Sequence, residues 1–298
     1  FTMRRNDADT NRTVSLNGGQ IDLYGNVIAG PGASGGTTKL VIKGDGDRTY
    51  ETATAGQRNF EYNYLVRDSL LSHLRVEMSG GTFKPTAATT NLTVRAFELI
   101  SGDFTAPPGI LTSGLGEGVA AFHVRGGTFR HNNGTLRVGL DINVQWSREH
   151  TLTLGQPVTL MHLDYAGGSS HTDGSFYHKL SFTTNTAKLA VLGDFLLARW
   201  GDHTNRTFRA MGGEIELYGN LIIGPGADGG TTKIVVKGDG DQTYSSAATG
   251  LRSYAREHTG NAYLPCLRVE KTGGSFVPAA ATTNLTVTEF QLAADDAA

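Results

Sequence analysis

The sequence predicts an all-β chain of stacked short strands, and three observations lead to this class. Glycine accounts for 40 of the 298 residues and charged residues for only 18%, a composition typical of short strands joined by tight turns. Apolar and polar residues alternate over runs of about five residues, which is the period of a strand. A long segment also occurs twice, as expected of a repetitive architecture.

The repeat joins residues 21–50 to residues 215–244, which are identical at 23 of 30 positions. The match resumes at Leu74 and Leu267, where LRVEMSGGTFKPTAATTNLTV is paired with LRVEKTGGSFVPAAATTNLTV. Sliding the chain by half of the 194-residue repeat aligns residues 38–41 with 135–138, which indicates a divergent copy in between. We therefore predict three modules in the order A-B-A, at residues 1–103, 104–200 and 201–298.

Within each module, strands are expected where apolar residues alternate between Gly-Gly, Asn-Gly and Gly-Asp turns. Ile21 and Leu23 are predicted to face the interior, with Asp22 and Tyr24 on the opposite side. Their counterparts Ile215 and Leu217 repeat the pattern. Short strands with inward apolar positions and brief connections favour a parallel β-helix, or β-solenoid, of tandem 97-residue modules. Tandem β-sandwich domains are the alternative, since about 100 residues is a usual sandwich size.

Four motifs carry a resemblance to a known class of repeats: TNLTVRAFELISGDF from Thr90, GGTFRHNNGTLRV from Gly126, KGDGDQTY from Lys237 and LRVEKTGGSF from Leu267. They resemble the β-solenoid repeats of very large bacterial cell-surface proteins, of the adhesin and autotransporter-passenger kind. The resemblance implies an extracellular location, a rigid stalk or coat, and no enzymatic activity or cofactor in the repeats. Each rung of a solenoid leaves strand edges that a neighbour would pair, so neighbouring repeats or copies of the chain are the expected partners.

Module B departs from the A copies in the segment of residues 162–178. This segment collects His162, His171 and His178 together with Asp164 and Asp173, residue types that ligate transition metals. Its spacing matches no zinc pattern, and a polar surface loop is the alternative.

The Gly-Asp-Gly-Asp turns of the two A copies are candidate calcium sites, through Asp45 and Asp47 and again through Asp239 and Asp241. The alternative is a turn that needs no ion, because Gly supplies positive φ and Asp bonds its own backbone.

Tyr24 and Tyr218 are candidates for stacking on sugar rings, which would make the chain a glycan-binding adhesin with cell-surface polysaccharide as its partner. Ordinary packing on the Tyr-Gly-Asn turns is the alternative reading. A polysaccharide lyase or hydrolase on a β-helix is a third possibility. The duplication argues against it, since a catalytic Asp45 would need a second site at Asp239. We expect no catalytic residues.

Charge and apolar runs limit the other classes of partner. The formal net charge of −2 lacks the basic excess that binds phosphates, so nucleic acid is not expected. No run approaches the roughly 20 apolar residues of a membrane-spanning helix. The single Cys266 excludes an intrachain disulfide, so strand pairing and packing must stabilise the fold.

Overall fold

The computed structural model describes residues 1–4, 13–53, 57–59, 65–67, 69–114, 120–139, 148–167, 176–183, 188–199, 206–224, 226–246 and 263–293. Every regular element in these ranges is a β-strand, which confirms the all-β class for this part of the chain. Strands β8 (Gln57–Asn59) and β9 (Leu65–Arg67) form a small antiparallel pair. All other pairings among the described residues are parallel. No described segment is a helix with the length and apolar character needed to cross a membrane.

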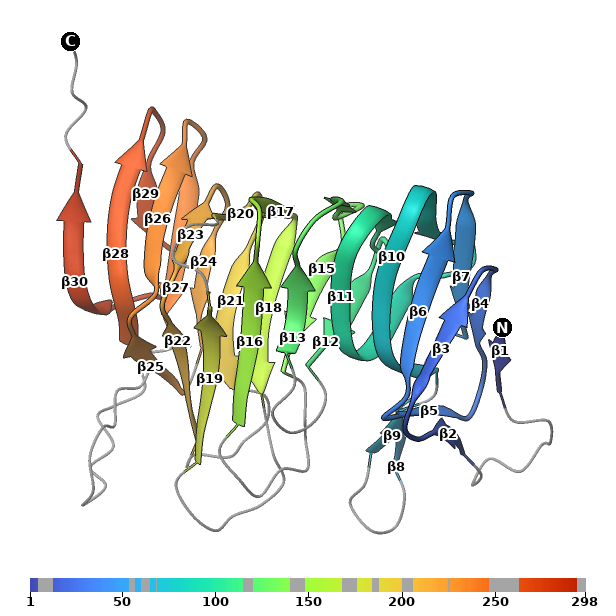
Figure 1. The fold of residues 1–298 in the computed structure, drawn as a ribbon. Helices are drawn as coiled ribbons and strands as arrows, with labels where there is room; N and C mark the ends of the chain where they lie inside the picture. The colour runs from blue at the N-terminus through green and yellow to red at the C-terminus, as the bar shows by residue number, and fades with distance from the viewer. Residues whose placement is uncertain are drawn as a thin grey trace.

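The parallel strands form three columns, and the chain passes through the columns in turn (Figure 1). The first column begins with β2 (Val14–Leu16), β5 (Ala33–Gly36) and the starts of two long strands, β10 (Leu70–Pro85) and β11 (Asn91–Thr105). It continues through β12 (Ile110–Ser113), β15 (Thr135–Val138), β18 (His162–Gly167), β21 (Phe195–Arg199), β24 (Leu221–Ile223), β27 (Gln242–Ser246) and β29 (Phe276–Pro278).

We call one passage of the chain through the three columns a coil. The second column, like the first, receives one strand from each coil. It contains β3 (Gln20–Leu23), β6 (Lys39–Gly44), the middles of β10 and β11, β13 (Ala120–Val124), β16 (Arg148–Leu154), β19 (Phe176–Phe182), β22 (Arg206–Met211), β25 (Ala227–Gly230) and the first residue of β28 (Tyr263–Lys271).

The third column completes each coil. It contains β1 (Thr2–Met3), β4 (Val27–Ala29), β7 (Arg48–Thr52), the ends of β10 and β11, and β14 (Thr128–Arg130), which lies beside β17 (Val158–Leu160). It ends with β20 (Leu189–Val191), β23 (Glu214–Leu217), β26 (Lys233–Gly238), most of β28 and β30 (Thr286–Leu292).

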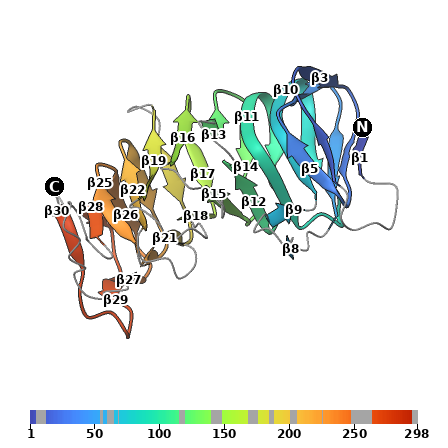
Figure 2. The same cartoon turned by 90° about the horizontal axis from the view of Figure 1, so that it is seen from below.

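Strand alternation points one set of side chains into the space between the columns and the other set outward. The inward residues form one apolar cluster that extends from Met3 to Leu267 and crosses both predicted module boundaries. Tyr50 and Phe104 near the first boundary and Phe195 near the second are all fully buried. The two termini lie at opposite ends of the stack, as both views show (Figures 1 and 2).

The two A copies keep the same strands but place them in different columns. Strand β3 is in the second column, whereas its duplicate β23 is in the third. Strands β4, β5 and β6 are likewise displaced by one column relative to β24, β25 and β26. The strands between the duplicates therefore do not make a whole number of coils. As a result, equivalent side chains of the two copies face different sides of the stack.

Candidate functional site

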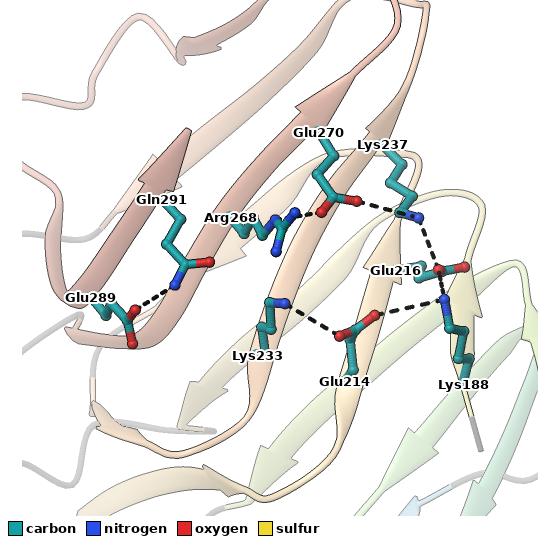
Figure 3. A network of polar contacts seen from close by, with 9 residues as sticks. All are labelled: Lys188, Glu214, Glu216, Lys233, Lys237, Arg268, Glu270, Glu289 and Gln291. Atoms are coloured by element: carbon teal, nitrogen blue, oxygen red, sulfur yellow. Dashed lines mark hydrogen bonds and ion pairs between the residues drawn. The ribbon is translucent and has the colours of Figure 1, made fainter. Parts of the chain in front are cut away.

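The most organised polar surface in the described residues is a ladder of charges on the outer face of the third column, across β23, β26, β28 and β30 (Figure 3). Outward positions on adjacent parallel strands lie beside each other, because the strands are only about 4.8 Å apart. We call this surface the charge ladder. Its members are Lys188, Glu214, Glu216, Lys233, Lys237, Arg268, Glu270, Glu289 and Gln291.

Opposite charges alternate from coil to coil along this ladder. Glu216 lies between two ammonium groups, with its Oε1 2.8 Å from Lys188 Nζ and 3.0 Å from Lys237 Nζ. Lys237 also reaches Glu270 at 3.5 Å, and Glu270 is paired with Arg268 in its own strand. The ladder therefore connects four successive coils by ion pairs between residues far apart in the sequence.

The electrostatics of Glu216 follow from these contacts. Burial alone would raise the pKa of its carboxyl group, but hydrogen bonds from Lys188 and Lys237 outweigh burial and lower the pKa. The same bonds raise the pKa of both lysines. All three groups are therefore held in their charged forms, which suits a structural contact rather than proton transfer near neutral pH.

The charge ladder also covers an apolar residue outside the core. Val235 has the outward parity of β26 and does not belong to the interior cluster, yet its exposed fraction is only 1%. Arg268 is its partner in register on β28, and the aliphatic stem of an arginine can cover such a side chain. Val41 and Arg75 repeat this arrangement in the first A copy, where Val41 is fully buried.

The first A copy carries an equivalent ladder on the second column. Asp22 is 2.9 Å from Lys43, and the hydrogen bond from Lys43 is the main cause of the lowered pKa of Asp22. Arg75 lies 3.3 Å from Glu77 and 3.7 Å from Glu98. Both ladders thus join coils in the same way, on different sides of the stack.

The carboxylates proposed for calcium are placed on turns beside the next coil. Asp47 accepts a hydrogen bond from the Thr82 backbone N–H at 2.9 Å and pairs with Lys84 at 3.0 Å. Asp241 accepts from the backbone N–H and the hydroxyl of Ser275, both at 2.8 Å. These contacts lower the pKa of Asp47 and of Asp241, and they describe turn-to-turn bridges. Asp45 and Asp239 lie on the same turns.

Two of the three histidines proposed for a transition metal, His162 and His178, lie in different columns. His162 is in β18 of the first column, where its Nδ1 accepts the Asp194 backbone N–H at 2.9 Å, and His178 is in β19 of the second column. Asp164 is paired with Arg137 at 2.9 Å. His171 and Asp173 lie outside the described residues. Within the described residues, no group of three or more His, Cys, Asp and Glu side chains is arranged to hold a metal ion.

The tyrosines proposed for glycan stacking are both exposed, Tyr24 by 64% and Tyr218 by 39%. They follow β3 and β23, which belong to different columns and lie near opposite ends of the stack. The structure therefore does not bring them together in one row along the molecule.

A hollow of about 420 Å³ lies at the C-terminal end of the stack, where the interior opens beside β29 and β30. Most of its lining residues are apolar, among them Leu267, Phe276, Phe290 and Leu292, and Lys271 is the charged member. Sequence reasoning identified neither this hollow nor the charge ladder. The sequence shows the outward charges of its strands, such as Lys233, Lys237 and Arg268, but which of them form ion pairs depends on the register between coils.

Comparison of the chain with protein-family models, with curated proteins and with solved structures found no match.

Proposed function

We propose that this chain is a non-catalytic structural segment of an extracellular bacterial surface or filament-forming protein. In this proposal the three columns are the sides of a β-solenoid, which acts as a rigid stalk or coat and associates with further coils or copies of itself. The bacterial surface location rests on the resemblance of the repeats to those of large surface proteins.

One observation carries the mechanical part of the proposal: the apolar interior and the parallel pairing continue through both module boundaries. Each coil satisfies the backbone groups and the apolar surface of the coil before it, as in solenoid proteins. Ten strands of the second column, spaced by about 4.8 Å, span roughly 43 Å. Adding coils would lengthen such a body at constant width, so the number of coils would set the length of the stalk.

The polar surface supports the same proposal. Glu216, Asp47 and Asp241 form bridges between coils and have lowered pKa values, whereas a general acid needs a pKa near the working pH. Glycan binding through Tyr24 and Tyr218 has no comparable support, because the strands that precede them, β3 and β23, lie in different columns.

Distance measurements between spin labels test the rigidity that a stalk requires. Ser79 and Thr272 are exposed and equivalent in the two A copies, so Ser79→Cys and Thr272→Cys can be labelled in a Cys266→His background. His73 occupies the place of Cys266 in the first copy, which makes histidine a matched replacement. We expect one narrow distance distribution. A broad distribution would indicate modules joined by flexible linkers and would contradict the proposal.

A further inference from the structure

The edge formed by β29 and β30, here called the C-terminal edge, exposes residues that are buried elsewhere in the same molecule. Phe290 is exposed by 55% and Leu292 by 71%, whereas their counterparts Phe97 and Leu99 in the first A copy are fully buried. Among the described residues, β30 pairs only with β28, so one side of β30 has no strand against it. Such an apolar strand edge is a site for further strand addition.

The hollow at this edge is the unfilled counterpart of a filled interior. Its apolar lining includes Tyr244, Leu267, Val269, Phe276, Leu285, Phe290 and Leu292. The equivalent residues of the first A copy all have exposed fractions of 1% or less. They are Tyr50, Leu74, Val76, Phe83, Leu92, Phe97 and Leu99.

The first copy shows what fills that interior. Three phenylalanines of residues 104–130 pack against the aromatic rings of module A: Phe104 from the end of β11, and Phe122 and Phe129 from the coil that follows. Phe104 lies 4.6 Å from Phe97 and 5.8 Å from Tyr50, and Phe122 lies 5.4 Å from Phe97, between ring centroids. Phe129 completes the cluster at 5.2 Å from Phe122.

Backbone contacts support the same junction. Phe97 pairs in register with Phe122, and Phe104 pairs with Phe129. The Tyr50 hydroxyl donates a hydrogen bond to the Thr105 carbonyl at 2.8 Å.

The second A copy holds the module A half of this cluster. Tyr244 and Phe276 lie 5.1 Å apart, the same separation as Tyr50 and Phe83 in the first copy. Phe290 stands where Phe97 stands. We infer that the C-terminal edge is a docking site for a segment with the sequence pattern of residues 104–130, whose three aromatic side chains would fill the hollow. This inference rests on the proposed stacking function and names the kind of coil that the edge accepts.

A coil of module A would fit the same edge less well. If β3 of a second copy lay on β30, Ile21 and Leu23 would face Phe290 and Leu292 and would supply no aromatic ring. Asp22 keeps Lys43 of its own copy as a partner, but it would lie opposite Gln291 and diagonal to Glu289, so the edge would offer it a second carboxylate and no cation.

The natural junctions avoid this arrangement. Where module A follows module B, Lys188 lies 2.8 Å from Glu216, the counterpart of Asp22. Where module B follows module A, it brings His123 into register with Glu98, the counterpart of Gln291. Module B thus places a lysine at one end of module A and a histidine at the other.

Two extended chains test the inference. In the first, residues 293–298 are replaced by a second copy of residues 100–200. In the second, they are replaced by residues 1–99, which contain the coils of module A and are similar in length to residues 100–200. Both carry Leu292→Cys in the Cys266→His background, and the rate at which a maleimide modifies the new thiol is measured against the unextended chain with the same two changes.

With the module B extension we expect modification to slow by at least about 100-fold, because the thiol then reacts only after local opening. With the module A extension we expect a rate within about 3-fold of the unextended chain. Equal protection by both extensions would show that the edge accepts any coil, and protection by neither would show that it accepts none. Either result overturns the inference.

A further variant controls for folding of the extension. The appended copy of Phe122 is changed to Asp in the module B extension, and circular dichroism monitors the strand content of the whole chain. We expect the fast rate of the unextended chain to return. Protection that survives this change would show that the aromatic side chains do not determine docking. The spin-label distances concern the unextended chain, so the stalk proposal and this inference can fail separately.

Discussion

Gly36 and Gly230 allow a close backbone approach between coils. Gly36 has φ +112°, and a Cβ built there would lie 1.9 Å from the Leu16 carbonyl oxygen. Its duplicate Gly230 has φ +123° and would place a Cβ 2.0 Å from the Ala210 oxygen. The Leu16 oxygen accepts hydrogen bonds from Thr37 and Thr38, so it cannot move away without breaking them.

We therefore expect Gly36→Ala to lower the free energy of unfolding by at least about 2 kcal/mol. The positive φ and the backbone overlap both oppose a side chain at this position. Gly25→Ala is the matched control, since a Cβ at Gly25 meets nothing within 4 Å. Denaturant titration of the two variants compares them, and equal midpoints would contradict the assignment of strain to Gly36.

The turn carboxylates give a prediction of pH dependence. Hydrogen bonds from Lys84 and the Thr82 N–H lower the pKa of Asp47 in the folded chain. A lowered pKa stabilises the fold above the unfolded pKa of about 3.9, and this contribution is lost as the pH falls through the folded pKa.

Val277 occupies the place of Lys84 in the second copy, so Lys84→Val is a natural exchange. We expect it to raise the pKa of Asp47, because the ammonium partner is removed. The pKa of Asp241 should not change, since Ser275 is its main partner. Carbon-detected NMR titration of the carboxyl groups measures both values. An unchanged Asp47 would show that Lys84 is not the cause.

At the scale of elements, β11 and β30 are the same strand in two environments. Strand β11 is covered on both sides, by β10 and by the strands that begin module B, whereas β30 pairs only with β28 in the described part of the chain. Phe97 and Leu99 therefore differ in burial from Phe290 and Leu292, although these apolar residues are the same in the two strands.

This difference predicts unequal effects of the same substitution. Phe97→Ala removes a fully buried ring from the aromatic cluster and should cost about 3–5 kcal/mol of unfolding free energy. Phe290→Ala removes a ring that is 55% exposed and should cost less than about 1 kcal/mol. Equilibrium unfolding in denaturant measures both. Similar losses would show that β30 is covered in solution.

At the scale of the whole molecule, stability should depend on position along the stack. A coil with neighbours on both sides opens only at the expense of two interfaces, whereas a terminal coil opens at the expense of one. We expect backbone amides of residues 286–292 to exchange with solvent at least about 100-fold faster than those of residues 93–99. Hydrogen exchange read by mass spectrometry compares these duplicated peptides within one sample. Equal protection of the two would contradict stacking as the source of stability.

Much of this architecture could be predicted from the sequence, because the alternation of apolar and polar residues is a local signal. Alternation around Ile21 and Leu23 predicted a strand whose Leu23 faces the interior, and the structure places β3 there with Leu23 8% exposed. The charge ladder and the aromatic cluster could not be predicted from the sequence. Lys188 and Glu216 are 28 residues apart, and only the register between coils shows that they meet.

The sequence by itself determined the strand class, the duplication and the apolar positions, because alternation and identity are properties of neighbouring residues. Only the tertiary structure decided which column each strand occupies. The duplicates β3 and β23 carry similar residues but lie in different columns, since the strands between them do not complete a whole number of coils. For the same reason Tyr24 and Tyr218 face different sides, and a row that the repeat suggested is not formed.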